Sequence, residues 1–223
     1  MDGLLYSFLI IVLLYLTPKL LSFILYRKSS YYKVTKKTFS SLDKGEFGEY
    51  LIFKRLKSFE KRDGRFLYNL YLPMTINDTT EVDVVLIHPK GFFVIESKNF
   101  SGWIFGNESN RYWTQTLPRG RGYESHKERF YNPIKQNSLH IKYLKPILGQ
   151  TVPMWSIIVF SDECTLKDVT VSPDTRYKVI QLHELKSVVS QIIKATEVEI
   201  FSQSDIDRMY NQLYPYSQTK VHS

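Results

Sequence analysis

The chain has 223 residues, of which 43% are hydrophobic and 15% aromatic, so it can bury a core and is not intrinsically disordered. Its formal net charge of +8 at pH 7 suits a polyanionic partner, either nucleic acid or an anionic lipid surface. The single cysteine, Cys164, excludes an internal disulfide framework and a zinc site built from several cysteines.

The amino-terminal segment is strongly apolar. A helix that crosses the hydrocarbon core needs ~20 mostly apolar residues, and residues 4–26 supply them. Pro18 would kink this helix, and Lys19 would have to extend toward the nearer membrane surface. A secretory signal is disfavoured because no basic stretch precedes the apolar run and no small-residue cleavage site follows it. We interpret residues 1–28 as a membrane anchor, with a buried core helix as the alternative.

Charge predicts how this anchor is oriented. Only Asp2 precedes the apolar run, whereas residues 27–37 contain five lysines and arginines. The positive-inside rule then predicts a single-pass membrane protein whose remaining chain is cytoplasmic. The same cations suit anionic lipid headgroups. Residues 29–41 are polar, basic and rich in tyrosine, and we interpret them as a juxtamembrane linker.

The next part of the chain predicts a helix followed by short strands. The helix is expected over residues 42–59 and ends at the Lys61-Arg62-Asp63-Gly64 turn. Strand-like segments are expected at residues 65–72, 81–88, 91–97, 103–105 and 112–114. Residues 117–129 are interpreted as a glycine-rich basic loop.

A second helix is predicted to open at Asn132, a good N-cap that is followed by Pro133, and to run to about residue 148. Further strands are expected at residues 152–160 and 178–182, and further helices at 184–194 and 204–213. This order predicts an α/β fold with a mixed sheet. We assign residues 42–160 to the core and residues 161–223 to a C-terminal extension that packs on it.

Two of the predicted strands, separated by Pro89-Lys90, form a β-hairpin that bears charged residues. If His88 pairs with Gly91, Asp83 lies opposite Glu96. Lys98 shares the face of Glu96, because side chains alternate along a strand. If instead His88 pairs with Phe92 through a bulge, Asp83 faces Ser97 and the arrangement is lost.

Two facing carboxylates destabilise a sheet unless something offsets their charge. A hard divalent cation such as Mg²⁺ would do so, since it binds one or two carboxylates together with water and phosphate oxygens. Lys98 could then orient or help to deprotonate an attacking water. The alternative is a surface ion trio of little energetic value.

These residues carry a family resemblance. Asp83, a dozen intervening residues and then Glu96-Ser97-Lys98 resemble the D…ExK core of the PD-(D/E)XK nuclease superfamily. The surrounding motifs resemble, in order, those of the NERD (nuclease-related domain) family over residues 44–148. They are Lys44-Gly45-Glu46-Phe47-Gly48-Glu49, Glu81-Val82-Asp83, Val94-Ile95-Glu96-Ser97-Lys98-Asn99, Gly102-Trp103-Ile104, Trp113-Thr114-Gln115 and Asn132-Pro133-Ile134-Lys135-Gln136-Asn137.

The resemblance implies a restriction-endonuclease-like mixed sheet flanked by helices. It also implies metal-dependent hydrolysis of phosphodiester bonds, with DNA preferred over RNA. Asp83, Glu96 and the backbone carbonyl of Ser97 would hold Mg²⁺ or Mn²⁺, and Lys98 would assist the nucleophile.

Two further residues are expected to support the site. Glu49 lies on the core-facing stripe of the first helix, where an unpaired carboxylate is costly. The resemblance implies that Glu49 completes the metal or water network; the alternative is that Glu46 caps the helix and Glu49 pairs with a lysine. Gln136 resembles a glutamine that steadies substrate or Lys98. His140 lies on the same helix face as Gln136, and we leave it outside the catalytic set as a packed structural residue.

Two other features could either contact nucleic acid or be ordinary structural elements. The Arg119-Gly120-Arg121-Gly122 loop could grip phosphates or could be a solvated loop. Tyr112 and Trp113 could stack on bases, although alternating aromatics in a short strand are usually core.

The predicted function is a membrane-anchored, metal-dependent nuclease. The first alternative is a catalytically inactive, membrane-tethered nucleic-acid-binding or scaffold module with a nuclease-like fold. A second is a protein–lipid adaptor, which would need only the basic segment after the anchor.

Overall fold

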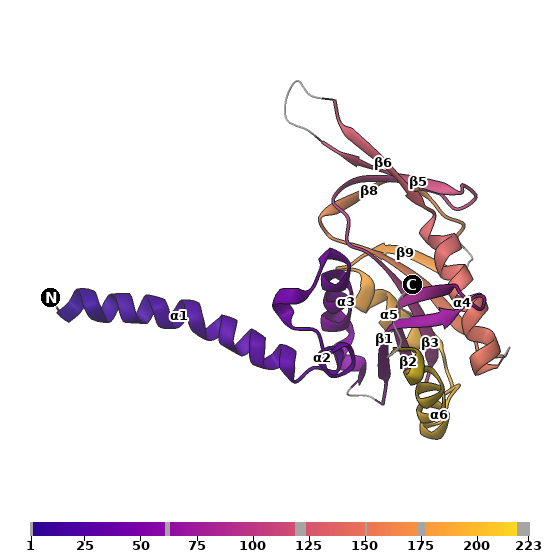
Figure 1. The fold of residues 1–223 in the computed structure, drawn as a ribbon, viewed down its shortest axis with the longest axis horizontal. Helices are drawn as coiled ribbons and strands as arrows, with labels where there is room; N and C mark the ends of the chain where they lie inside the picture. Colours follow the sequence, from indigo (N-terminus) through magenta and orange to yellow (C-terminus); the bar gives the residue numbers. More distant parts are fainter. Residues whose placement is uncertain (1, 61–62, 119–123, 150, 174–176, 218–223) are drawn as a thin grey trace. The chain divides into compact units, whose positions relative to one another are not determined.

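The computed structural model describes residues 2–60, 63–118, 124–149, 151–173 and 177–217 (Figure 1). The chain forms two compact units, Met1–Leu42 and Asp43–Ser223. The phosphate-gripping loop proposed for Arg119 to Gly122 lies outside the described residues.

The first unit is helical. It contains α1 (Asp2–Arg27), α2 (Ser30–Thr35) and the short 3-10 helix η1 (Phe39–Ser41), and α1 continues through Pro18. Within the part of the chain that the structure describes, no helix combines the length and the apolar character needed to cross a membrane.

The segment interpreted as a linker is ordered around Tyr26. The Tyr26 hydroxyl donates to the carbonyl of Lys37 at 2.7 Å. Its ring contacts Tyr31, Tyr32 and Phe39 with centroid separations of 6.3, 5.7 and 5.3 Å. Ser29 caps α2 by accepting from the backbone N–H of Tyr32. This tyrosine-rich sequence therefore forms a small aromatic cluster within the first unit.

The second unit is built on a five-stranded mixed sheet with the strand order β1-β2-β3-β7-β9. The strands are β1 (Arg65–Pro73), β2 (Thr79–His88), β3 (Gly91–Lys98), β7 (Met154–Phe160) and β9 (Tyr177–Gln181). The first three strands are antiparallel, and β3, β7 and β9 are parallel. The expected mixed sheet is therefore present.

Helices cover both faces of this sheet (Figure 1). On one side lie α3 (Lys44–Glu60) and α5 (Leu185–Ala195), and on the other lie α4 (Pro133–Leu148) and α6 (Gln203–Leu213), followed by η2 (Tyr214–Ser217). The largest apolar cluster joins the sheet to α4 and α6. Burial of this apolar surface is the main favourable contribution to the stability of the unit.

A second, four-stranded sheet follows β3, with the order β6-β5-β4-β8. Its strands are β4 (Gly102–Asn107), β5 (Tyr112–Leu117), β6 (His126–Tyr131) and β8 (Cys164–Thr170). Gly102 begins β4 at φ 78°, and a Cβ there would lie 2.4 Å from the carbonyl oxygen of Thr116. This close approach at positive φ favours glycine. Because β4 pairs with β5 and β8 and not with β3, the expectation of a single sheet is corrected to two.

Candidate active site

The hairpin of β2 and β3 has the register that places the charged residues together. His88 pairs with Gly91, and the ladder continues to Val84 opposite Ile95. One step further along this register brings Asp83 across from Glu96. The alternative with a bulge, in which His88 pairs with Phe92, is wrong.

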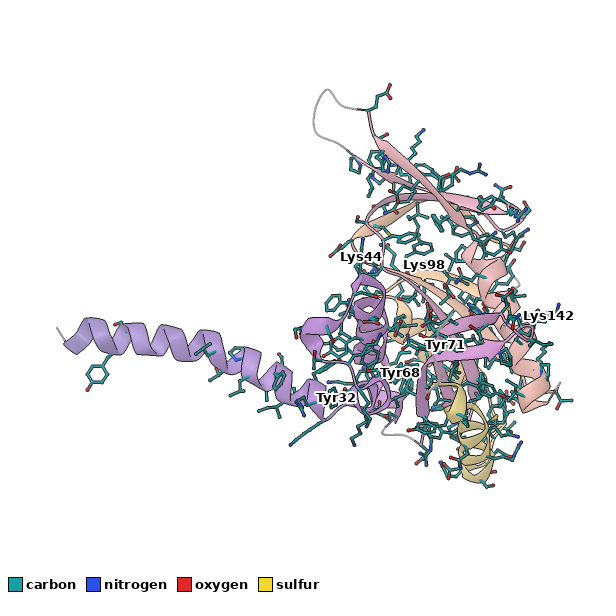
Figure 2. The ribbon with its side chains drawn as sticks, viewed as in Figure 1. Tyr32, Lys44, Tyr68, Tyr71, Lys98 and Lys142 are labelled. Atoms are coloured by element: carbon teal, nitrogen blue, oxygen red, sulfur yellow. The ribbon has the colours of Figure 1, made fainter. Side chains whose placement is uncertain are left out.

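Glu96 and Lys98 meet on one face of β3. Figure 2 labels Lys98. Its ammonium nitrogen lies 2.7 Å from Glu96 Oε1, and it also donates to Gln136 Oε1 at 3.1 Å. The Glu96 side chain is 1% exposed and that of Lys98 is 16% exposed. Gln136 comes from the first turn of α4, so the helix that covers this face also holds the lysine in place.

The second oxygen of Glu96 contacts a histidine. His140 Nε2 lies 3.1 Å from Glu96 Oε2, and His140 Nδ1 lies 2.8 Å from the hydroxyl oxygen of Thr80. Burial favours a higher pKa for Glu96, but the Lys98 ammonium and the His140 hydrogen bond outweigh it and lower the pKa. Glu96 is therefore ionised at neutral pH. Since an ionised carboxylate only accepts, His140 Nε2 carries the proton of this bond.

The surroundings of Asp83 disfavour its ionised form. Its pKa is raised well above the usual carboxyl value by burial, then by the charges of Glu96 and Glu49, and Lys98 and the Ser97 amide only partly offset these effects. The backbone N–H of Ser97 donates to Asp83 Oδ2 at 2.7 Å. The N–H and C=O of one strand residue point toward the same neighbouring strand, so the Ser97 carbonyl is directed to this side as well.

Glu49 is buried at the edge of the site and accepts a hydrogen bond from an asparagine. Asn69 Nδ2 donates to Glu49 Oε1 at 3.1 Å and to Glu81 Oε1 at 3.0 Å. The Tyr71 hydroxyl donates to the same oxygen of Glu81 at 2.7 Å. Asn69 therefore connects a carboxylate of α3 with a carboxylate of β2.

Asn69 was not predicted from the sequence to belong to the site. It has φ 51°, and the ladder between β1 and β2 has no pair between Tyr68–Val84 and Leu70–Val82, where Asn69 would face Asp83. Asparagine adopts this left-handed conformation more readily than most residues. A polar residue that tolerates positive φ, inside an otherwise apolar strand, was the available signal.

The start of α3 also fits closely against the sheet. Asp43 and Glu46 exchange backbone-to-side-chain hydrogen bonds at 2.9 and 3.1 Å, so Glu46 caps the helix as the alternative reading expected. A Cβ on Gly48 would lie 2.7 Å from the Ser97 hydroxyl and 3.0 Å from Asn99 Cβ. Gly48 is therefore the position at which α3 approaches β3 closely. At Gly45 a Cβ would meet only Asp43, at 3.3 Å.

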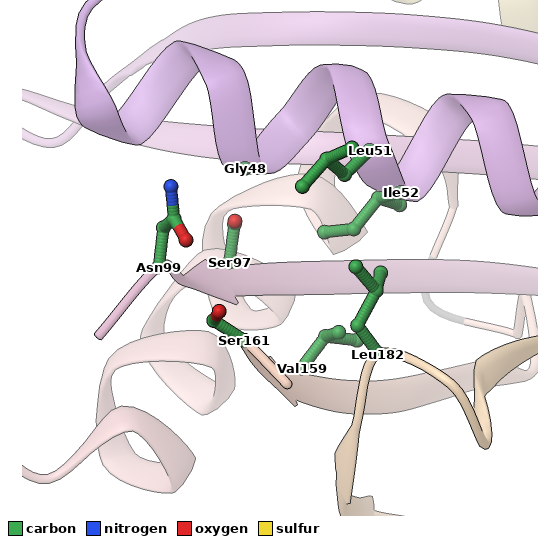
Figure 3. A pocket seen from close by; sticks show the side chains of 8 residues that line it. All are labelled: Gly48, Leu51, Ile52, Ser97, Asn99, Val159, Ser161 and Leu182. Atoms are coloured by element: carbon green, nitrogen blue, oxygen red, sulfur yellow. The ribbon is translucent and has the colours of Figure 1, made fainter. Parts of the chain in front are cut away.

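Figure 3 shows a narrow crevice between α3 and the sheet. The Ser97 side chain points into it beside Gly48 and Asn99, on the face opposite to Glu96 and Lys98. The Ser97 hydroxyl is thus separated from the charged cluster, and only the backbone of this residue is directed toward Asp83. The crevice is lined largely by apolar side chains and is not the site of the charged chemistry.

The donor set suits a hard divalent cation. Among the described residues no group of three or more His, Cys, Asp or Glu side chains could hold a metal ion. The expected set contains only two such side chains, Asp83 and Glu96, together with the Ser97 carbonyl. Mg²⁺ commonly binds through one or two carboxylates and keeps several waters. Burial, and then the charges of Glu96 and Glu49, raise the pKa of Asp83, and a bound cation would stabilise the ionised form against these effects.

Two other motif residues are structural. Gln115 is buried, and its side-chain amide donates to the Ser101 carbonyl at 2.8 Å. Trp113 is 1% exposed and donates to the Asn107 carbonyl at 2.9 Å, so the core interpretation holds for it. Tyr112 lies on the other face of β5 and is exposed.

Comparisons with known proteins agree with this geometry. The family described as nuclease-related domain matches residues 44–161. An uncharacterized protein of Bacillus anthracis is 30% identical over 170 residues, which cover 76% of this chain and 75% of that protein. No solved structure shows a significant match.

Proposed function

Because the chain belongs to the nuclease-related domain family, we propose that it is a metal-dependent nuclease that hydrolyses phosphodiester bonds, with DNA preferred over RNA. The observation that carries the proposal is the convergence of Glu96, Lys98 and Gln136 beside Asp83, where the end of β3 meets the middle of β2. The preference for DNA rests on the family resemblance. The restriction-endonuclease-like arrangement is part of the same proposal, supported by the antiparallel hairpin followed by the parallel strand β7.

Each residue has a distinct task in this proposal. Asp83, Glu96 and the Ser97 carbonyl would hold Mg²⁺ or Mn²⁺, which would supply Lewis-acid activation of the phosphate and of the attacking water. Lys98, held by Glu96 and Gln136, orients the attacking water and stabilises the negative charge that builds at the scissile phosphate.

Glu49 supports the site from α3. It adds negative charge next to Asp83, and its own position is held by the Asn69 amide. A second hydrogen bond from Asn69 to Glu81 keeps the amide in place. Glu49 thus increases the attraction of the site for a cation.

The test is a cleavage assay on the full-length protein in mild detergent, with single- and double-stranded DNA and RNA, in Mg²⁺, Mn²⁺ or EDTA. We expect cleavage of DNA that requires the metal and that is lost in Glu96→Gln, a variant that keeps the shape of the side chain. Glu197→Gln, at an exposed carboxylate after α5 that contributes nothing to the proposed site, is the matched control. Binding of nucleic acid without any cleavage would favour the inactive binding module.

Membrane attachment is a separate proposal, supported by the apolar sequence of residues 4–26 and the basic residues after it. Large apolar side chains in the second half of α1, including Leu20, Leu21 and Leu25, are exposed. We expect the protein to remain in the membrane pellet after alkaline extraction and a carboxyl-terminal reporter to be cytoplasmic. Recovery of the full-length protein in the soluble fraction without detergent would refute the anchor.

A further inference from the structure

The four-stranded sheet has one face that packs on the core and one that does not. Trp113 and Ile104 belong to the buried cluster, and Phe130 packs against it. Side chains alternate along a strand, so the neighbours of these residues point to the opposite face. We call this opposite face the aromatic–basic face; the residues that define it are Trp103, Tyr112, Tyr131, Lys127, Arg129 and the adjacent Arg111.

The rings on this face are open to solvent. Trp103 is 43% exposed, and Tyr112 and Tyr131 are each 41% exposed. They come from three neighbouring strands, β4, β5 and β6. Tyr112 pairs directly with Tyr131, with ring centroids 6.2 Å apart. Large exposed rings gathered on one sheet face are typical of a binding surface.

Cations accompany the rings. The guanidinium carbon of Arg129 lies 4.9 Å from the centroid of the Tyr112 ring, and that of Arg111 lies 5.4 Å from the same centroid. Lys127 is two residues from Arg129 on the same face of β6. The acidic residue between them, Glu128, points to the other face, where its Oε1 is hydrogen-bonded to His126 Nε2 at 2.8 Å. Asp168 is on β8, at the opposite edge of the sheet.

This combination discriminates between ligands. Aromatic faces stack on bases of any sequence, and arginine adds cation–π and phosphate contacts. In a duplex the base faces are already stacked on one another, so exposed rings on a sheet favour a single strand. Anionic lipid also attracts basic residues and interfacial tyrosine and tryptophan, so vesicle competition is included in the test.

The face is also linked directly to the candidate active site. Tyr131 ends β6, and the chain passes through Asn132 into the first turn of α4, where Gln136 contacts Lys98. At the other side, β3 ends at Lys98 and is followed within a few residues by β4. Both connections are short, so the face and the site are held by consecutive elements of one unit.

We propose that the aromatic–basic face binds single-stranded nucleic acid, with bases stacked on Tyr112, Tyr131 and Trp103 and phosphates contacted by Arg111, Lys127 and Arg129. The inference rests on the proposed function, because it identifies the form of substrate delivered to the site. It makes single strands, or duplexes with single-stranded ends, the preferred ligands.

The test is fluorescence anisotropy with a fluorescein-labelled oligothymidylate, using the full-length protein in mild detergent with EDTA to prevent cleavage. We expect Tyr112→Ala and Tyr131→Ala each to weaken binding by roughly 5- to 160-fold, which corresponds to the ~1–3 kcal/mol that one stacked ring contributes. Tyr112→Phe, which keeps the ring, should bind as the wild type does. Tyr214→Ala is the matched control, because Tyr214 is 38% exposed on η2, outside this face.

Salt dependence tests the cations separately. Each lost phosphate contact should reduce the slope of log K against log salt by about 0.7 for a single strand. Arg129→Ala should therefore lower the slope, whereas Lys142→Ala, which removes an exposed cation near a tyrosine of α4, should not. Thermal unfolding monitored by circular dichroism confirms that each variant is folded.

The outcomes separate this inference from the proposed nuclease activity. Unchanged binding in Tyr112→Ala and Tyr131→Ala, with metal-dependent cleavage intact, overturns the aromatic–basic face alone. Strand binding that depends on these tyrosines, without cleavage in any metal, overturns the nuclease and keeps the face. Equal affinity for a blunt duplex, or complete competition by phosphatidylglycerol vesicles at equal charge, also overturns the single-strand assignment.

Discussion

Replacing His140 with leucine should expose how strongly the buried hydrogen-bond chain supports Glu96. The variant removes two buried bonds, one to ionised Glu96 and one to Thr80, and leaves both partners inside the protein. A hydrogen bond to a charged group contributes ~1.5–3 kcal/mol, and one between neutral groups ~0.5–1.5 kcal/mol. Leucine fills much of the ring's volume, so the cavity contribution is small. We therefore expect the free energy of unfolding to fall by about 2–4 kcal/mol.

The loss should depend on pH with a definite sign. Because the folded pKa of Glu96 is lowered, its ionised form contributes stability that is present above the unfolded carboxyl pKa and is lost as pH falls through the folded pKa. The difference between wild type and His140→Leu should therefore shrink in acid. Thr80→Val removes only the neutral bond and is the matched control, with an expected loss of about 1 kcal/mol.

Urea unfolding at several pH values measures the stability, and cleavage titrated with Mg²⁺ measures the functional effect. Loss of a group that orients a metal ligand typically costs ~10–100-fold in metal affinity or activity. His140→Gln, which can still donate to Glu96, should recover part of the activity. A His140→Leu variant that unfolds like the wild type and cleaves at the same Mg²⁺ concentration would refute the reasoning.

Three further changes test the surroundings of the site. Asp83→Asn should raise the melting temperature in EDTA near neutral pH. The folded pKa of Asp83 is raised, so the wild type loses stability as the pH rises from the usual carboxyl range through that pKa, and asparagine avoids this loss. Mg²⁺ should stabilise the wild type and not this variant, and a variant less stable than wild type in EDTA at alkaline pH would contradict this. Gly48→Ala should destabilise by ~1–3 kcal/mol in urea, because the added Cβ meets Ser97 and Asn99, whereas Gly45→Ala should not destabilise; equal effects would disprove the close approach. Asn132→Ala should cost about 2–4 kcal/mol, because its side chain caps α4 and donates to the carbonyls of Glu108 and Asn110, and Asn132→Ser, which keeps only the cap, should lie in between.

Much of the site could be predicted from sequence because it depends on local geometry. Strand alternation places Glu96 and Lys98 on one face of β3 in either register that the Pro89-Lys90 turn allows. The structure then selects the register in which Asp83 lies opposite Glu96. Gln136 follows a recognisable N-cap and falls in the first turn of α4. Each of these steps spans only a few residues.

The features that were missed depend on distant or weak signals. His140 lies 44 positions from Glu96, and nothing in its own helix indicates a buried carboxylate on the opposite side. The role of Asn69 depends on a gap in the ladder between β1 and β2, which is visible only in the folded sheet. Strand β6 has the sequence HKERFY, which is exposed over most of its length and lacks apolar alternation. Pairing with β5, not burial of its side chains, defines β6 as a strand.

The central claim is that Lys98 acts at the reacting phosphate, and single-turnover cleavage by Lys98→Ala tests it most directly. Lys98 forms an ion pair with the buried Glu96 carboxylate, so the variant should be less stable than the wild type, and cleavage is compared at a temperature where circular dichroism shows both proteins folded. Under these conditions both should bind nucleic acid in EDTA. The charge of Lys98 is needed when negative charge builds in the transition state, so the Mg²⁺-dependent rate should fall by ~10²–10³-fold. Lys142→Ala, an exposed lysine of α4, should cleave normally. A Lys98→Ala protein that cleaves at the wild-type rate would contradict the account.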